Sequence, residues 1–404
     1  MFFKKFFIYF FSFIFVIFIR IISFFFLIRF IKINTHRIGH FAANLELYFC
    51  ELEKRNIKPN NFFFDIAFCD DAFPTCNHFL LKLWKREIVF WPASICYPII
   101  RINKFLDNLV LGSSKHIISS SKSDRDIFNL LDVTKPKIKL NKDEIKKGEE
   151  FLFEKFGITE KDKIVCLIIR DDKYLNETNN SIDYSYHNYR HTNIDSFNKS
   201  IKTLIDKGYY VFRMGVSVNK PLLIKHSHVI DYAYMKMRTD FLDVYLAQRC
   251  SFCISTSTGY DALPLIFRKH IGFITVPIGL VFSFSEKFVS ITKHHYSLDK
   301  KRNLSLKEIF QNDLGFAKRS KDFVNKNIIL NENSEDEINN LVIEVHERYS
   351  NKYKDEESSI NLQNIFWNNF ENNIKSNSAF KNFHGKIKGK INYNFLINNK
   401  DFIE

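Results

Sequence analysis

Short apolar runs alternate along the chain with longer stretches in which apolar residues recur at helical spacing. The runs 62–68, 164–169 and 252–254 are too short for helices and are bounded by polar or small residues, which predicts buried strands. We predict further strands at 88–90 and 209–214. The stretches 195–207 and 240–248 carry apolar residues three and four positions apart, which predicts helices. Strands and helices in alternation indicate the α/β class, with parallel sheets.

The first residues of the chain differ from this pattern because they are almost entirely apolar. From Phe6 to Ile28 only Ser12, Arg20 and Ser23 interrupt the run. About 20 apolar residues suffice to cross a bilayer, so we predict a hydrophobic membrane anchor helix over 1–33. Arg20 lies near the middle of this run, and a charge at the centre of a span costs roughly 2.5–3.5 kcal/mol. Two arrangements therefore stay open: a tilted span, or a helix or hairpin lying in the inner leaflet.

Two α/β domains and a tail follow this segment. Residues 34–140 predict an N-terminal α/β domain, and 141–330 predict a second, doubly wound α/β domain. The C-terminal helical tail, 331–404, starts at Ser334, which forms a capping box with Glu337. The fold predicted is therefore two Rossmann-like domains behind an anchor.

A turn rich in hydroxyl groups joins the buried strand 252–254 to the next helix, which is predicted over 260–267. It reads S-T-S-T-G, from Ser255 to Gly259. The free N–H groups at a helix start bind anions, phosphate above all. Ser and Thr are also ordinary N-caps, and Gly also relieves tight turns, so the turn taken alone favours a structural role. In its setting we expect Ser257, Thr258 and Gly259 to bind a donor phosphate.

Three arginines lie at the ends of predicted strands or in the loop after one of them: Arg170, Arg190 and Arg213. Ligands of open α/β sheets bind beyond the carboxyl ends of the strands, and arginine suits bidentate phosphate contact. The alternative is a set of salt-bridging arginines, with Asp171 and Asp172 as obvious partners for Arg170. Together with the Ser/Thr turn, the three arginines favour a phosphate site, and Gly215 beside Arg213 belongs to it.

Two further places carry residues suited to a substrate. Gly39 and His40 follow His36 and Arg37 at a predicted helix start, which predicts a substrate loop or simply a capped helix. Because an imidazole titrates near neutral pH, we expect His40 to act as a base or to face the acceptor. Asp240 starts the helix at 240–248, where it serves as a cap or binds a ribose or base.

The composition of the chain limits the classes of binding partner that we expect. The 404 residues carry a net charge of +14, with Lys and Arg scattered and no nucleic-acid-binding signature. The excess fits an anionic membrane surface and a phosphate-bearing substrate. Seven cysteines, an odd number, do not suggest a disulfide framework. Cys166 and Cys253 lie inside apolar runs and resemble buried small hydrophobes. We predict no metal site and no cofactor.

Four runs carry a resemblance to a known family: H-R-I-G-H, L-I-I-R-D, F-R-M-G and I-S-T-S-T-G-Y-D-A-L-P. From about Thr35 to Phe310 the chain resembles an uncharacterised family of bacterial glycosyltransferases of surface-polysaccharide synthesis. It is more distantly similar to two-domain (GT-B) transferases, especially the fucosyltransferase branch with its H-x-R-R core. Arg170 matches the core arginine, whereas Ile168 and Asp171 replace the histidine and the second arginine.

This resemblance implies a metal-independent transferase that uses a nucleotide sugar and has its site between two Rossmann-like domains. In this plan 34–140 is the acceptor domain and 141–330 the nucleotide-sugar domain. We expect a membrane-associated enzyme on the cytoplasmic face that glycosylates a lipid-linked or polysaccharide acceptor, with Arg170 and His40 catalytic. Two alternatives stay open. A nucleotide-sugar epimerase would share the double-Rossmann plan and need no acceptor, and a non-catalytic membrane-anchored assembly protein would carry degenerate phosphate residues.

Overall fold

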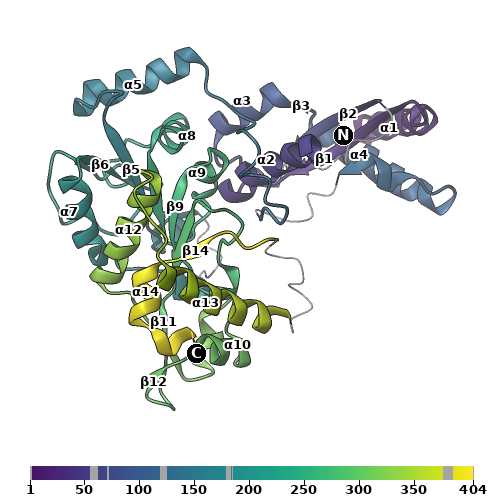
Figure 1. Cartoon of the computed structure of the whole chain (residues 1–404). Helices are drawn as coiled ribbons and strands as arrows, with labels where there is room; N and C mark the ends of the chain where they lie inside the picture. Colours follow the sequence, from purple (N-terminus) through teal and green to yellow (C-terminus); the bar gives the residue numbers. More distant parts are fainter. Residues whose placement is uncertain are drawn as a thin grey trace. The chain divides into compact units, whose positions relative to one another are not determined.

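The chain folds into two compact units, each with its own parallel sheet (Figure 1). Unit 1 is Met1–Asp124 with Thr134–Leu140, and unit 2 is Arg125–Val133 with Asn141–Glu404. The structure is a computed structural model. It describes residues 2–54, 62–70, 72–118, 125–178, 183, 185–375 and 385–403.

Unit 1 contains a four-stranded sheet in the order β3-β2-β1-β4, with every neighbouring pair parallel. Its elements are α1 (Phe2–Ile22), β1 (Phe26–Ile33), α2 (Ile38–Lys54), β2 (Phe62–Cys69), α3 (His78–Glu87), β3 (Val89–Phe90), α4 (Ala93–Phe105) and β4 (Ile117–Ile118), with 3-10 turns at Leu106–Asn108 and Ser113–His116. The strands predicted at 62–68 and near Ile88–Phe90 are confirmed.

The segment predicted as one hydrophobic anchor consists of two elements. The helix α1 ends at Ile22, and Phe26–Ile33 is β1, a central strand of the sheet. An unbroken apolar run has no period that separates a helix from a buried strand, so the sequence does not show where one ends. Within the described residues, no helix is long and apolar enough to span a bilayer.

Arg29 shows why this part of the run is a strand of the sheet. Its partner in the β1–β2 register is Asp65, and the Arg29 Nε donates to the Asp65 carboxylate at 2.8 Å. Burial raises the pKa of Tyr48, whose hydroxyl also donates to Asp65. A buried cation matched to an acid directly opposite it fixes the register, because a slip of one residue would separate them.

Unit 2 is built on a seven-stranded parallel sheet in the order β14-β10-β9-β8-β5-β6-β7. The strands of this sheet are β5 (Lys163–Ile168), β6 (Tyr209–Met214), β7 (Val229–Ile230), β8 (Phe252–Ser255), β9 (His270–Ile274), β10 (Phe288–Ile291) and β14 (Lys390–Ile391). The helices are α5 (Lys142–Phe156), α6 (Lys173–Thr178), α7 (Asn198–Asp206), α8 (Asp240–Arg249), α9 (Ala262–Ile266), α10 (Leu306–Gln311), α11 (Ser320–Val324), α12 (Glu335–Tyr349), α13 (Glu357–Lys375), α14 (Tyr393–Asn398) and α15 (Lys400–Ile403).

Both faces of this sheet are covered by helices, which confirms the predicted parallel α/β arrangement of unit 2. Val165 and Leu167 of β5 belong to the core that includes residues of α7 and α12. Cys166 lies between them in sequence and contacts the Leu246 carbonyl of α8 at 3.8 Å. Because successive strand residues point to opposite faces, α7 and α12 cover one face and α8 the other (Figure 1).

The predicted C-terminal tail is part of unit 2. The helix α12 packs on β9 and β10, and the short strand β14 pairs with β10. A second, antiparallel sheet of β11 (His294–Ser297), β12 (Arg302–Asn303) and β13 (Ile328–Asn331) was not predicted. Its strands are short and partly polar, so they lack the apolar runs on which the strand predictions rest.

Strand order defines one place in each sheet where a ligand is expected. In unit 2 the chain passes from β5 to β6 and β7 in one direction, and from β8 to β9 and β10 in the other. In unit 1 it passes from β1 to β2 and β3, while β4 lies on the other side of β1. Crevices form at such switch points, beyond the carboxyl ends of β5 and β8 and of β1 and β4.

Candidate phosphate-binding site

The switch point of unit 2 is the place where the first predicted arginine meets the Ser/Thr turn. The backbone N–H of Arg170, just beyond β5, donates to the Thr256 hydroxyl at 2.8 Å. The N–H of Thr256 in turn donates to the Ile168 carbonyl at 3.0 Å. The two strand ends are thereby tied together, and Arg170 is fixed beside the turn that follows β8.

Ser257 gives that turn an unusual backbone. Its φ of 58° is in the left-handed region, which is unfavourable for residues other than glycine. The conformation is held because the Ser257 hydroxyl bonds the Ile274 carbonyl at 3.2 Å and the Thr275 hydroxyl at 3.1 Å. Within the described chain, the backbone N–H groups of Thr258 and Gly259 that follow have no hydrogen-bond partner. Strain of this kind, beside free donors, is common at ligand sites.

The helix after the turn is shorter than the sequence predicts. α9 runs only from Ala262 to Ile266, so a helix dipole contributes little at this turn. The Ser255 hydroxyl is also occupied, because it donates to the Asp261 carboxylate at 2.9 Å. Free backbone donors, rather than the serine hydroxyls or a helix terminus, are what the turn offers to an anion.

Arg190 reaches the same turn from the loop between β5 and α7. Its Nη2 donates to the Ser257 carbonyl. The N–H of Thr192 donates to the Arg170 carbonyl at 3.4 Å, and the Lys293 ammonium, which follows β10, donates to the His191 carbonyl. The loop therefore crosses the carboxyl ends of three strands and carries Arg190 to Arg170. Lys293 was not predicted, and only its position after an apolar strand could have indicated it.

The electrostatics of Arg170 distinguish it from an ordinary paired arginine. Burial and the neighbouring charge of Arg190 lower the pKa of Arg170 to about 10, so it is still a cation at neutral pH. Its Nε is buried without a hydrogen-bond partner, and neither Arg170 nor Arg190 forms an ion pair within the described residues. Burial and Arg170 also lower the pKa of His191. Two adjacent cations that lack an anion define a site for one.

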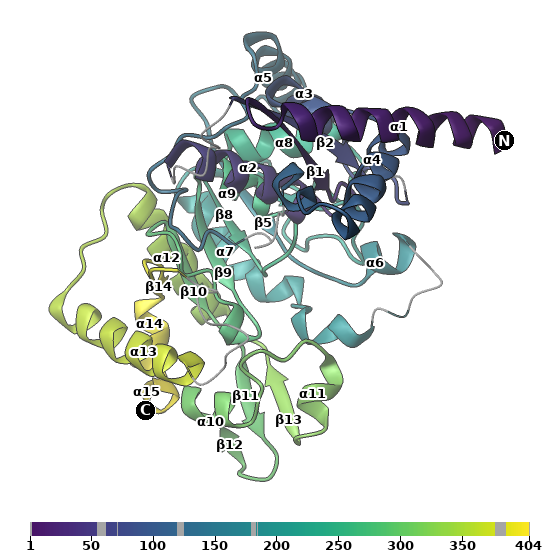
Figure 2. The ribbon, with the colours of Figure 1, turned by 90° about the vertical axis from the view of Figure 1, so that its right-hand side faces the viewer.

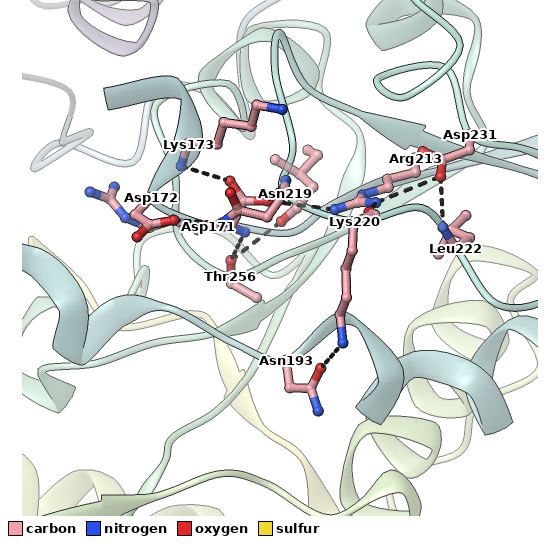
Figure 3. Close-up of polar contacts among 12 residues, drawn as sticks. Asp171, Asp172, Lys173, Asn193, Arg213, Asn219, Lys220, Leu222, Asp231 and Thr256 are labelled. Carbon is pink, nitrogen blue, oxygen red and sulfur yellow. Dashed lines mark hydrogen bonds and ion pairs between the residues drawn. The ribbon is translucent and has the colours of Figure 1, made fainter. Parts of the chain in front are cut away.

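Arg213 is differently placed, as Figure 3 shows. Its side chain is only 2% exposed, with Asp231 at 3.6 Å and Asp171 at 3.7 Å. Its Nη1 also donates to the Lys220 carbonyl at 2.5 Å. The guanidinium is enclosed within unit 2 and its charge is compensated there, so Arg213 has a structural role at the strand end.

Asp171 and Asp172, which the sequence offered as partners of Arg170, hold another loop. The N–H of Asn219 donates to Asp171 at 2.9 Å, and its side-chain amide donates to Asp172 at 2.5 Å (Figure 3). This loop starts at Gly215, whose φ of 153° suits glycine. The aspartates thus order the β6–β7 loop and leave Arg170 without a counter-ion.

The surroundings of Asp240 fit the structural role that its position at a helix start favours. Its carboxylate pairs with Arg238 at 3.0 Å, and the same arginine pairs with the buried Asp243 at 2.9 Å. The helix α8 is capped by Thr239, which accepts the Leu242 N–H at 3.1 Å. Burial raises the pKa of Asp243 to about 6.

The predicted loop of unit 1 follows β1 at its own switch point. Gly39 is buried and His40 half-buried in the first turn of α2. Nearby, His36 stacks on Phe73 with ring centroids 4.5 Å apart, and burial lowers the pKa of His36. The structure therefore places Gly39 and His40 in unit 1, whereas the arginines and the Ser/Thr turn belong to unit 2.

A cluster of thiols that could hold a metal escaped the sequence reasoning. Within the described residues, Cys166, Cys250 and Cys253 place their sulfur atoms within 4.8 Å of one another, fully buried, and the last two form a C-x-x-C pair. Hydrogen bonds from the other two thiols lower the pKa of Cys250. The chain also has one Asp-x-Asp pair. Its Asp126 is buried and accepts the Leu131 N–H at 2.7 Å, while Asp124 lies outside the described residues.

Neither of two hollows in unit 2 is lined by Arg170 or Arg190. One, of about 490 Å³, is lined by residues of β11, β12 and the C-terminal helices, and another, of about 600 Å³, lies at the amino ends of the strands, near Lys163, Ser251 and His270. By shape alone, these hollows would be the candidate ligand sites. Charge and strand order instead indicate the carboxyl edge of the sheet. These two criteria carry more weight for an anion, because it needs hydrogen-bond donors before it needs enclosure.

No family model matches the chain, and the comparison with curated proteins gives no significant match. Among solved structures, the chain is similar to the ADP-heptose LPS heptosyltransferase II of E. coli (12% identity, 65% of this chain and 90% of that one, TM-score 0.41). It is also similar to a family 9 glycosyl transferase of Veillonella parvula (10%, 80% and 97%, 0.42) and to the iron-containing heptosyltransferase TibC of E. coli (10%, 79% and 76%, 0.35). At these TM-scores the likenesses carry no argument about fold or activity. The resemblance to fucosyltransferases stays a prediction.

Proposed function

We propose that the protein is a glycosyltransferase that uses a nucleoside-diphosphate sugar. The observation that carries this proposal is the pair Arg170 and Arg190, two cations without an ionic partner at the switch point of a parallel sheet. A diphosphate would satisfy both guanidinium groups and the free N–H groups of Thr258 and Gly259. Two parallel α/β units in one chain match the GT-B plan that the sequence resemblance implies.

In the proposed reaction an acceptor hydroxyl attacks the anomeric carbon, and the bond from that carbon to the phosphate oxygen breaks. The leaving diphosphate gains negative charge as the bond breaks, and Arg170 and Arg190 stabilise it without a divalent metal. His40, from the other unit, takes the proton of the acceptor hydroxyl. The acceptor is proposed to be a lipid-linked or polysaccharide chain at the cytoplasmic face of the membrane.

The test measures binding of nucleotides to the full chain by the change in thermal stability and by calorimetry. The panel contains ADP-, UDP- and GDP-sugars, the free diphosphates and the nucleosides. Charge-assisted hydrogen bonds contribute about 1.5–3 kcal/mol, so Arg170→Gln and Arg190→Gln should each weaken diphosphate binding about tenfold to a hundredfold. Nucleoside binding should change little. Arg302→Gln, an exposed arginine on β12, is the matched control.

The outcomes separate the candidate functions. Binding of no nucleotide would overturn the proposal and favour an assembly protein without catalysis. A converted sugar nucleotide in the absence of any acceptor would favour an epimerase. For the transferase, His40→Ala should abolish turnover while the dissociation constant of the donor changes little.

A further inference from the structure

The helix α1 has a buried face and a large exposed apolar face. Its buried positions, Ser12, Val16 and Ile19, lie three or four residues apart, as one face of a helix requires. They pack towards α4 and the unit 1 sheet. Its exposed positions are nearly all large and apolar: Phe6, Phe7, Phe10, Phe11, Phe13, Ile14, Ile17, Phe18 and Ile21. Figure 2 shows the N-terminal turns of α1 extending beyond α4.

A second exposed apolar segment is fastened to the end of this helix. Leu109, Val110 and Leu111 are 79%, 67% and 86% exposed. The Arg20 guanidinium donates to the Val110 carbonyl at 2.6 Å and to the Asp107 carboxylate at 2.9 Å. Asp107 also accepts the backbone N–H of Gly112 at 3.0 Å, so both sides of the loop are fixed.

These contacts show how the charge of Arg20 is accommodated within the apolar run. The charge that would be costly at the centre of a span is bound to α4 and the loop after it. A helix attached to its own domain along one face and at Arg20 can offer only its other face to lipid. The geometry therefore favours a helix lying in the plane of the interface.

Charge around the apolar surface is one-sided. Unit 1 has 19 Lys and Arg against 9 Asp and Glu, a net charge of +10 out of +14 for the chain, and the first 45 residues contain no acid. Arg101 bonds the Tyr9 hydroxyl of α1 at 3.2 Å, and Lys115 bonds the Ser23 hydroxyl at 2.8 Å. Exposed cations thus lie along α1 and at its end, with Lys104 exposed on α4.

We propose that α1 and the loop Leu109–Leu111 form one docking surface for a bilayer that contains anionic lipid. Apolar side chains enter the acyl boundary, while Arg101, Lys104 and Lys115 contact the headgroups. A cationic rim around an apolar face matches an anionic lipid surface better than it matches a second copy of this chain, whose surface would carry the same charge. The surface is independent of the proposed sugar transfer.

The test is flotation of the full chain with vesicles of phosphatidylcholine alone or mixed with phosphatidylglycerol. Binding should require the anionic lipid and weaken with salt. Leu109→Ser combined with Leu111→Ser should reduce binding at least about tenfold, because two exposed leucines no longer enter the bilayer. Leu223→Ser combined with Val324→Ser, exposed residues of unit 2, is the matched control and should bind normally.

The cations and the orientation are tested separately. Arg101→Gln combined with Lys104→Gln should weaken binding to anionic vesicles by about fivefold for each charge removed. The new tryptophans of Phe11→Trp and Leu111→Trp should both be quenched by shallow brominated lipids, and quenching of Phe11→Trp by deep brominated lipids would show a spanning helix. Failure of the wild type to float, equal loss in the unit 2 control, or a dimer that the Leu109/Leu111 change dissolves would each overturn the proposal. None of these outcomes depends on nucleotide binding.

Discussion

Arg170 and Arg213 both lie at strand ends of one sheet, yet replacing them should have opposite effects on stability. Arg213→Met removes the cation that Asp231 and Asp171 face at 3.6 Å and 3.7 Å, inside the protein. Breaking a buried ion pair by removing one partner costs about 3–5 kcal/mol, because the remaining charge stays buried. A domain of this size loses about 2–4 °C in Tm for each kcal/mol, which gives a loss of roughly 6–20 °C.

Arg170→Met removes a buried cation whose pKa is lowered by burial and by the neighbouring charge of Arg190. Methionine keeps most of the apolar stem, and the lost guanidinium made no ion pair within the described residues. We therefore expect the free energy of unfolding without ligand to stay within about 0.5 kcal/mol of the wild type or to rise. The same variant should lose the stabilisation that a nucleoside diphosphate gives the wild type.

Urea unfolding, followed by hydrogen exchange at β5 and β6, reports unit 2 separately from unit 1. Asp231→Asn in the Arg213→Met background is the control for the ion pair, because it removes the stranded carboxylate and should recover about 0.5–3 kcal/mol. A loss above about 2 kcal/mol in Arg170→Met would refute the reasoning, since a paired arginine would then have been removed. So would an Arg213→Met protein as stable as the wild type.

Three smaller changes test other parts of unit 2, each by urea unfolding. Burial lowers the pKa of His295 to about 4 from 6.5, so the unfolded chain binds a proton first and stability falls as the pH drops through this range. His295→Gln should flatten that slope by about 1.4 kcal/mol per pH unit, and an unchanged slope would contradict the assignment. Ser257→Gly should be about 1 kcal/mol more stable than Ser257→Ala, the reverse of the usual order, because its φ is 58°. Gly148→Ala should cost about 1–3 kcal/mol, since a Cβ there would lie 2.3 Å from the Tyr245 ring, and Tyr245→Leu should restore part of it.

The sequence predicted the elements that a single local pattern defines. The strands at β2, β5, β6 and β8 are short apolar runs between polar residues, and their parallel pairing follows from the helices between them. Where one apolar run contains two elements, the pattern gives no boundary, and the turn between Ile22 and Phe26 was missed for that reason. β14 was missed because Lys390–Ile391 gains its strand conformation only by pairing with β10.

For the site residues, the sequence predicted positions but not partners. Sequence order placed Arg170, Arg213 and the Ser/Thr turn at strand ends, because the carboxyl edge of a parallel sheet follows from strand direction. It could not assign their partners, since Asp231 is 18 positions beyond Arg213 and reaches it only through the pairing of β6 with β7. The nearest acid in sequence, Asp171, instead accepts the Asn219 N–H and faces Arg213.

The arginines discussed above therefore differ in whether acids of the protein compensate their charge. Arg20, Arg29 and Arg213 each face carboxylates of their own unit, although the buried Nε of Arg213, like that of Arg170, has no hydrogen-bond partner. Arg170 keeps a buried donor without an acceptor and a like charge beside it, which the folded state tolerates at a loss of stability. An anion that binds there removes both penalties at once, so its affinity comes partly from strain that the empty site already carries. That is why a change at Arg170 should weaken binding more than it weakens the fold.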